Sequence, residues 1–197
     1  MLRNLRITAR DGGSCVFEVH GSTGLANAVR RALMTDVARY APSEVLIRKN
    51  TSAQNDEFIA HRIGQIPFLR DDGDEASELT LRVCGREAAS NDFAGKGFRA
   101  PPDVPIVLLG AGHELDLSVR FRRATGTEHA RFSLAGPVAY RVDGAVATLG
   151  FATITGESAL GYLRDALLAL QGKIRRAEVF AEAEYDARRR LITDKKK

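Results

Sequence analysis

The chain has 197 residues, of which 44% are hydrophobic and 27% are charged, a composition typical of a soluble globular protein and not of a disordered chain. This length allows one ordinary domain or two small ones. No apolar run approaches the roughly 18 residues of a membrane-spanning helix, and the N-terminus lacks a signal-peptide pattern. The sequence therefore predicts an intracellular protein without membrane contact.

Cysteine usage limits the metal and redox chemistry. Cys15 and Cys84 are the only cysteines, and they lie far apart in the sequence. Two distant cysteines make neither a disulfide framework nor a cysteine-ligated metal site. His113 and His129 also lack metal-ligand spacing to other histidines or cysteines. We therefore expect no metal and no cofactor.

The net charge of +4 is unevenly distributed. Residues 188–197 contain six basic side chains and one acid, and removing them from the 29 basic and 25 acidic residues of the whole chain leaves 23 and 24. The body is thus nearly neutral, and we predict that residues 188–197 form a basic flexible tail. Two hypotheses follow: a solvated terminal charge run, or salt-sensitive phosphate contacts that would make the chain an independent nucleic-acid-binding protein.

The first fifty residues predict a hairpin followed by a helix. Apolar residues alternate on both sides of Asp11-Gly12-Gly13, which favours a turn. Ser22 or Thr23 can cap a helix that runs to about Arg39, with an apolar stripe of Leu25, Val29, Leu33 and Val37. Asn27 and Arg31 lie opposite this stripe and Arg30 flanks it. Pro42 is expected to end the helix, before a short strand at residues 45–47.

The middle of the sequence and its C-terminal part differ in the spacing of their apolar residues. Strand patterns near residues 79–83, 106–109, 115–121 and 147–154 alternate with loops, which predicts a β-rich insertion into a domain built from both chain ends. A helix from Ser158 to about Ala187 would be ~45 Å long. Its apolar residues are spaced alternately by three and four positions: Leu160, Leu163, Leu167, Leu170, Ile174, Ala177 and Ala181. This seam packs either on its own core or on a partner protein.

Four polar residues suggest acid–base chemistry. Asp56, Glu57, His61 and Arg62 cluster in sequence, and on a helix Glu57 and His61 would lie one turn apart. A small acid–base enzyme is therefore one hypothesis. The competing structural interpretation, which base rates favour, is a set of caps and ion pairs that holds a short helix before Pro67.

Three segments carry a resemblance to a known family. They are D-E-F-I-A-H-R-I-G-Q-I-P at residues 56–67, L-A-N-A-V-R-R-A-L at residues 25–33, and G-T-E-H-A-R-F-S at residues 126–133, the last followed by Tyr140-Arg141. These segments, and their order along the chain, resemble the α-like subunits of multisubunit DNA-directed RNA polymerases. The family comprises the archaeal D subunit and the eukaryotic third-largest subunit, which are related to the bacterial α N-terminal domain.

The resemblance implies an α+β fold. A discontinuous dimerisation domain, with a sheet, helices and a long C-terminal helix, would comprise residues 1–50 and 144–187, and a β-rich insert domain would comprise residues 51–143. It also implies a non-catalytic assembly subunit that forms a heterodimer with a small α-like subunit and a platform for the large catalytic subunits. DNA would be reached only through the complex.

The resemblance assigns roles to three sets of residues. The interface with the small α-like partner would comprise Leu160, Leu163, Leu167, Leu170 and Ile174. The second-largest catalytic subunit would dock on Asn27, Arg30 and Arg31, since the planar guanidinium of arginine pairs well with carboxylates. The insert, and contacts with very small zinc-containing subunits, would depend on Asp56, Glu57, His61 and Arg62.

The sequence departs from the family pattern at one chemical feature. Many members bind an iron–sulfur cluster or zinc through a cysteine group in the insert, which Cys84 alone cannot provide. We therefore expect that site to be absent. The chain fits a compact archaeal-like polymerase or that of a large DNA virus, and it would act in the archaeal cytoplasm, a viral factory or virion, or a eukaryotic nucleus. A bacterial-type homodimer stays open.

Overall fold

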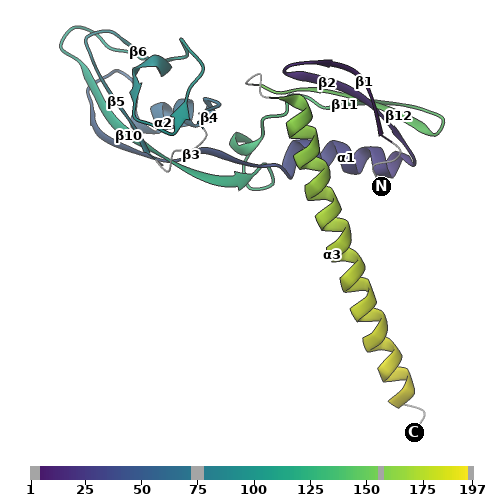
Figure 1. Ribbon diagram of the computed structural model, residues 1–197. Helices are drawn as coiled ribbons and strands as arrows, with labels where there is room; N and C mark the ends of the chain where they lie inside the picture. Colours follow the sequence, from purple (N-terminus) through teal and green to yellow (C-terminus); the bar gives the residue numbers. More distant parts are fainter. Residues whose placement is uncertain (1–4, 72–77, 155–157, 195–197) are drawn as a thin grey trace.

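The computed structural model describes residues 5–71, 78–154 and 158–194, although not the side chains of residue 183 and residues 185–194. About a third of the chain is helical and somewhat more is strand, which confirms the predicted α+β class. Figure 1 shows two bodies joined by long strands, with one helix extending far from them. None of the described helices is long and apolar enough to cross a membrane.

One body contains a four-stranded antiparallel sheet in the order β1-β2-β12-β11, which we call the terminal sheet. β1 (Leu5–Asp11) and β2 (Ser14–His20) form the predicted hairpin, and β11 (Ala139–Asp143) and β12 (Val146–Ala152) form a second one. β2 pairs with β12, with Phe17 opposite Leu149. Segments from the two halves of the sequence thus build one sheet.

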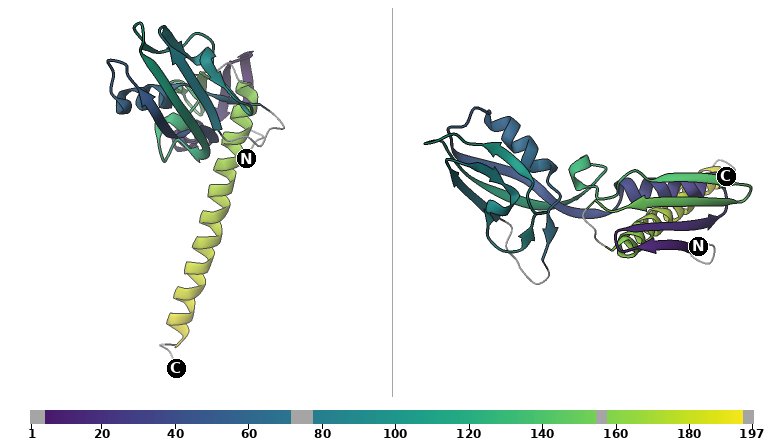
Figure 2. Two further views of the ribbon diagram at one scale, coloured as in Figure 1. Left: turned by 90° about the vertical axis from the view of Figure 1, so that its left-hand side faces the viewer. Right: turned by 90° about the horizontal axis from the view of Figure 1, so that it is seen from above.

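Two helices, α1 (Thr23–Thr35) and α3 (Ala159–Asp194), pack against one face of the terminal sheet (Figures 1 and 2). Ser22 caps α1 as expected, because its hydroxyl accepts a hydrogen bond from the Leu25 N–H. The Tyr162 hydroxyl on α3 donates to the Leu33 carbonyl at 3.0 Å, and burial raises the pKa of this phenol. The resulting core includes Phe17, Leu33, Leu149 and Leu163.

The prediction for the end of the first helix was wrong. α1 ends at Thr35, and β3 runs from Ala38 to Asn50 with Pro42 inside the strand. β3 lies at the edge of its sheet, where the N–H that proline lacks is not needed for pairing on both sides. The pairing register also shifts beside Pro42, and a bulge of this kind accommodates proline.

The insert body contains a second sheet, in the order β3-β10-β5-β7. β10 (Glu114–Thr125) pairs along its length with β3 and with β5 (Glu78–Cys84), and β7 (Phe93–Ala94) is short. Two further strand pairs are β4 (Leu69–Arg70) with β8 (Phe98–Arg99), and β6 (Glu87–Ala89) with β9 (Pro105–Leu108). The 3₁₀ helices η2 (Ser90–Asp92) and η3 (Ala130–Phe132) lie between strands.

The insert has its own apolar core, to which α2 (Asp56–Gln65) contributes Ile59 and Ile63. Phe98 and Phe121 stack at 3.9 Å between ring centroids, and Phe68 packs edge-on against Phe121. This cluster of buried residues is separate from the core under the terminal sheet. The expected division into a dimerisation domain and an insert domain, with boundaries at residues 50 and 143, stays a prediction.

α3 is longer than predicted. Its 36 residues span about 54 Å, and Ala166 is the last fully buried residue among the side chains of α3 that the structure describes. Every described side chain from Arg175 to Glu182 is exposed. The helix continues to Asp194, through most of the segment predicted as a basic tail, whose side chains lie outside the description, as do residues 195–197. The described core contacts of α3 therefore come from its first turns, up to the partly buried Leu170.

The segment 126–133 joins the two bodies. The Thr127 N–H donates to the Thr35 carbonyl at the end of α1, and Phe132 is buried with Ala41 and Ala124. A Cβ atom at Gly126 would lie 2.6 Å from the Met34 carbonyl oxygen, which is a backbone atom that cannot turn away. Because a side chain at position 126 would overlap this oxygen, only glycine fits there. This is a physical reason for the glycine that begins the segment 126–133.

We predict that Gly126→Ala destabilises the protein by about 1–3 kcal/mol, because the added methyl group overlaps fixed backbone. Gly12→Ala is the matched control, since nothing lies within 4 Å of a Cβ atom there. Chemical denaturation of both variants measures the free energy of unfolding. Equal stability of the two variants would contradict the close approach at Gly126.

Candidate subunit interface

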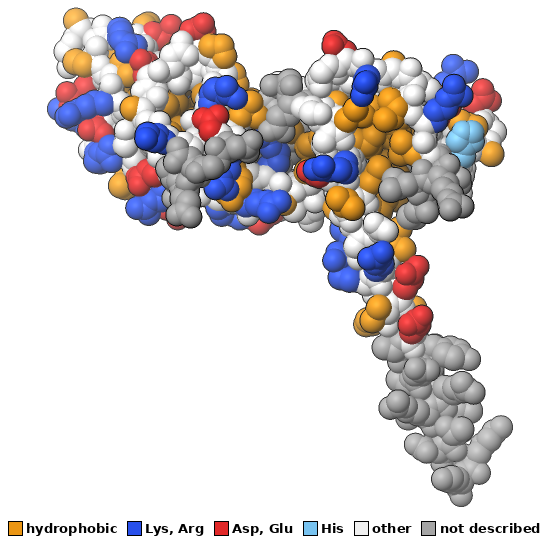
Figure 3. Space-filling view, in the orientation of Figure 1, with side chains coloured by type: hydrophobic (Ala, Val, Ile, Leu, Met, Phe, Trp, Pro, Cys, Tyr) orange, Lys and Arg blue, Asp and Glu red, His pale blue; other side chains and the backbone are white. Residues whose placement is uncertain are grey.

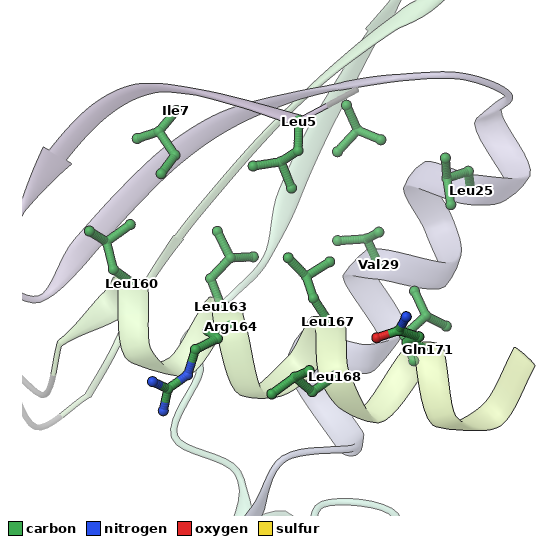
Figure 4. Close-up of a pocket in the computed structure, with 12 residues that line it drawn as sticks. Leu5, Ile7, Leu25, Val29, Leu160, Leu163, Arg164, Leu167, Leu168 and Gln171 are labelled. Carbon is green, nitrogen blue, oxygen red and sulfur yellow. The ribbon is translucent and has the colours of Figure 1, made fainter. Parts of the chain in front are cut away.

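An apolar groove of about 490 Å³ lies between β1, α1 and α3 (Figure 4). Ten of its twelve lining residues are aliphatic, and they come from β1, β2, α1 and α3. The lining consists of Leu5, Ile7, Val19, Leu25, Val29, Leu160, Leu163, Arg164, Leu167, Leu168, Leu170 and Gln171. In Figure 4, Arg164 lies at the border of this apolar surface with its guanidinium directed away from the sheet.

The structure brings together four of the five residues predicted for the partner interface. Leu160, Leu167 and Leu170 line the groove and are partly buried, whereas Leu163 is only 3% exposed and belongs mainly to the core of its own domain. Ile174 is half-buried but does not line the groove. Their role as an interface stays a prediction.

Sequence reasoning did not assign the opposite wall of the groove. Leu5 and Ile7 on β1 and Leu25 on α1 face α3, and their alternating or helical spacing had indicated only that they would be buried. Leu168, which lies off the predicted seam of α3, is 56% exposed beside the groove. The apolar spacing of these residues is visible in the sequence, but it does not show which helices and strands pack against one another.

Apolar exposure continues along α3 beyond the groove. Val179 and Phe180 are 66% and 71% exposed on the part of the helix that leaves the body. Figure 3 shows hydrophobic side chains gathered on the body beside the first turns of this helix. Exposed apolar side chains gathered in this way are typical of a protein-binding site.

An ion pair holds α3 at the point where it leaves the body. The Lys173 ammonium contacts the Asp36 carboxylate at 2.6 Å, and the Asp36 side chain is only 6% exposed. Thr35 donates a second hydrogen bond to the same carboxylate oxygen. Asp36 follows the C-terminus of α1, where the helix dipole disfavours an anion, so the lysine offsets both this effect and partial desolvation.

The polar face of α1 carries the second set of predicted contact residues, Asn27, Arg30 and Arg31. Arg30 is half-buried, and its Nε donates to the Asn27 side chain at 3.2 Å, which restrains both groups. Arg31 is exposed, as its position opposite the apolar stripe predicted. The three side chains thus lie on one helix with one arginine restrained and one directed to solvent.

The third set of predicted contact residues, Asp56, Glu57, His61 and Arg62, lies on α2. Asn55 caps the helix, and Asp56 accepts a hydrogen bond from the Asn50 amide at 2.7 Å. Arg62 donates to the Pro105 carbonyl at 2.8 Å, which ties α2 to β9. The expected caps are therefore present, and hydrogen bonds to neutral groups take the place of the ion pairs expected beside them.

The acid–base pair predicted on α2 is not assembled. Glu57 and His61, both in the described part of the chain, are exposed and make no hydrogen bond or ion pair with each other. A general base needs a partner or a substrate within hydrogen-bonding reach, and it is usually held in a cleft. The geometry therefore favours the structural interpretation of this motif.

Comparison with known proteins gives the family. No protein-family model matches the sequence. The chain is 30% identical to the DNA-directed RNA polymerase subunit Rpo3 of Methanocaldococcus jannaschii, over 62% of this chain and 66% of that protein. It is 28% identical to the mouse subunit RPAC1 of RNA polymerases I and III, over 80% and 59%, and 30% identical to the RNA polymerase II subunit rpb3 of Dictyostelium discoideum, over 55% and 47%.

The chain belongs to the family of the archaeal D and eukaryotic third-largest RNA polymerase subunits. This confirms the resemblance drawn from the three motifs. The matched part of each of these three relatives is less than two thirds of its length. In the fold, two of the family motifs meet, because the Arg131 guanidinium lies against Gly64 and donates to the Pro42 carbonyl at 3.0 Å.

The metal site of many family members has no counterpart among the residues that the structure describes. No group of three histidine, cysteine or acidic side chains there could hold a metal ion. Cys84 is exposed at the end of β5, whereas Cys15 is buried in the terminal core, where burial raises the pKa of its thiol. The expectation of a chain without metal or cofactor stays a prediction.

We predict that a double-mutant cycle of Asp36→Ala and Lys173→Ala gives a coupling free energy of about 0.5–1 kcal/mol, because one partner is buried and hydrogen-bonded. The exposed pair Arg164 and Asp165 is the control, and its cycle should give a value near zero. Denaturation at low and high salt measures both. Equal coupling in the two cycles would show that Asp36 does not anchor α3.

Proposed function

We propose that this chain is an assembly subunit of a DNA-directed RNA polymerase and forms a heterodimer with a small α-like subunit. Each of the relatives described above is named as a polymerase subunit. The observation that carries the proposal is the apolar groove on β1, α1 and α3, which continues into exposed apolar residues on the protruding helix.

The energetics of α3 support a partner on this face. Leu168, Val179 and Phe180 are each more than half exposed, and burying such a side chain stabilises a complex by up to about 1.5–3 kcal/mol. An isolated helix that makes no tertiary contacts is marginal in water. A partner helix that fills the groove beside Leu160, Leu167 and Leu170 would reach Leu168 and Val179, which lie eleven residues apart and therefore on nearly the same side of α3.

The polar face of α1 is the proposed docking site for the second-largest catalytic subunit. Arg31 is exposed and Arg30 is restrained by Asn27, so their guanidinium groups are available to carboxylates or carbonyl oxygens of a partner. This face is distinct from the apolar side of α1 that lines the groove. One helix would therefore contact two partners at once.

The exposed side of α2 is the proposed contact for a very small zinc-containing subunit. Glu57 and His61 are exposed, and Arg62 lies 5.8 Å from the centroid of the half-exposed Phe58 ring. The apolar side of the helix is committed to the insert core through Ile59 and Ile63. The charged residues of the motif would then organise subunit contacts, with catalysis in the large subunits and DNA reached through the complex.

Co-expression with the small α-like subunit of the same polymerase tests the proposal. We expect a soluble 1:1 heterodimer, and self-association or aggregation of this chain when it is expressed alone. A well-behaved monomer that ignores the small subunit would contradict the proposal. Tight duplex binding that disappears when residues 188–197 are removed would favour the independent nucleic-acid-binding function instead.

We predict that Leu168→Asp weakens binding of the small subunit by at least about tenfold, because it places a charge in an apolar interface. Leu46→Asp is the matched control, since Leu46 is a similarly exposed leucine, at 60%, on the insert sheet. Titration by calorimetry or fluorescence measures both affinities, and thermal denaturation checks that both variants stay folded. Equal affinities would exclude the groove face of α3 as the interface.

A further inference from the structure

A second groove, of about 610 Å³, lies at the junction of the insert with the base of α3. We call it the junction groove. Its lining comes from the start of β3, from β4, from the end of β10 and from the first turns of α3, and it includes Tyr40 and Tyr162. The family motifs do not line this groove, and Arg164 is the one lining residue that it shares with the apolar groove.

The junction groove is strongly basic although the body of the protein is not. Among the described residues that line it, Arg39, Arg70, Arg123 and Arg164 are basic and Asp165 is acidic, which gives these side chains a net charge of +3. Residues 1–187 as a whole have a net charge of −1. A cleft lined by charges of one sign concentrates oppositely charged groups. Figure 3 shows lysine and arginine side chains between the two bodies, in the region of this groove.

The arginines stand on a rigid base. The Arg70 guanidinium lies 4.4 Å from the Tyr40 ring centroid, and Tyr40 packs in turn on Phe98 of the insert core. Arg39 donates to the Phe68 carbonyl at 3.4 Å. On the other wall, Tyr162 is buried and hydrogen-bonded to α1. Donors held in place by a core lose little entropy on binding a ligand.

Arg123 and Arg164 extend this base toward solvent. Arg123 is exposed near the end of β10, and the side chain of Arg164 is 74% exposed on α3. They come from opposite walls of the groove, one from each body. A ligand that engages both would therefore bridge the insert and the dimerisation domain. Each guanidinium has five N–H donors in a planar fork that fits a carboxylate with two parallel hydrogen bonds.

The aromatic residues distinguish between anionic ligands. Proteins that bind single-stranded nucleic acid stack the bases on open aromatic faces. Here Tyr40 is covered by Arg70 and Phe98, and Tyr162 is only 5% exposed. A duplex needs a basic surface along an extended face, not one short groove. The groove thus has guanidinium groups that can bind carboxylates, whereas its two tyrosine rings are not open for a nucleic-acid base to stack on.

We propose that the junction groove binds an acidic segment of a partner protein, whose carboxylates pair with Arg123 on one wall and Arg164 on the other. The inference rests on the proposed function for the identity of that partner as another subunit of the polymerase. The segment would fix the insert relative to the dimerisation domain, so that the platform has one geometry when the large subunits assemble.

A peptide titration tests the groove in the full-length chain by itself. The probe is a fluorescein-labelled glutamate-rich peptide of about ten residues, titrated at about 0.1 M salt and again at higher salt. We expect the double variant Arg123→Glu with Arg164→Glu to bind at least about tenfold more weakly than wild type. Arg10→Glu with Lys96→Glu is the control, because it makes the same change in charge at exposed sites outside the groove.

The control separates the groove from the basic residues 188–197, which both variants retain. Equal loss of peptide binding in the two variants would overturn the proposal, as would no loss in either. The same titration with a labelled single-stranded oligothymidylate tests whether the groove binds nucleic acid. Oligonucleotide binding that is tighter than peptide binding and is lost only in the groove variant would also overturn it. Circular dichroism confirms that each variant is folded.

Assembly provides the second readout. The single variant Arg123→Glu, which leaves the lining of the apolar groove unchanged, should form the heterodimer with the small subunit normally but recruit the large subunits at least about threefold more weakly, with the difference shrinking at high salt. Normal recruitment would overturn the junction-groove proposal and leave the proposed function intact. If the wild-type chain binds no small subunit, the proposed function fails, and the peptide titration still decides whether the groove binds an acidic segment.

Discussion

The pairing of β2 with β12 is the contact on which the rest of the structure depends. It joins a strand near the N-terminus to one beyond residue 145 and places Phe17 opposite Leu149, both completely buried. Because side chains alternate along a strand, a shift of one residue would turn this apolar row to solvent. The pairing therefore fixes the sheet on which α1 and α3 lie, and it forces residues between the two strands to leave and return as an insert.

The binding surfaces follow from what this sheet leaves uncovered. α3 covers part of the sheet with Tyr162 and Leu163 and then overhangs it, so the apolar groove lies where the helix and β1 diverge. Gly126 closes the opposite side, where the insert returns against α1. The junction groove lies at the base of α3 and shares Arg164 with the apolar groove. The chain thus has an apolar face and a basic cleft, which we propose as sites for different partners.

Local patterns in the sequence were accurate where the structure depends on local physics. The spacing of Leu160, Leu167 and Leu170 predicted one face of a helix, since the period of a helix is a property of neighbouring residues. The cap at Ser22 was found for the same reason. Pro42 was misinterpreted because its effect depends on whether its strand lies at an edge, which the position of β10 decides.

The sequence by itself determined the α+β class, the amphipathic helices, the hairpin and the family, because periodicity, caps and short motifs are carried by adjacent residues. Only the tertiary structure decided that Leu5 and Ile7 form the second wall of the apolar groove. It also decided that Arg123 and Arg164 meet across a cleft. These groups are far apart in the chain, and their proximity depends on strand pairing and helix packing, which no local pattern encodes.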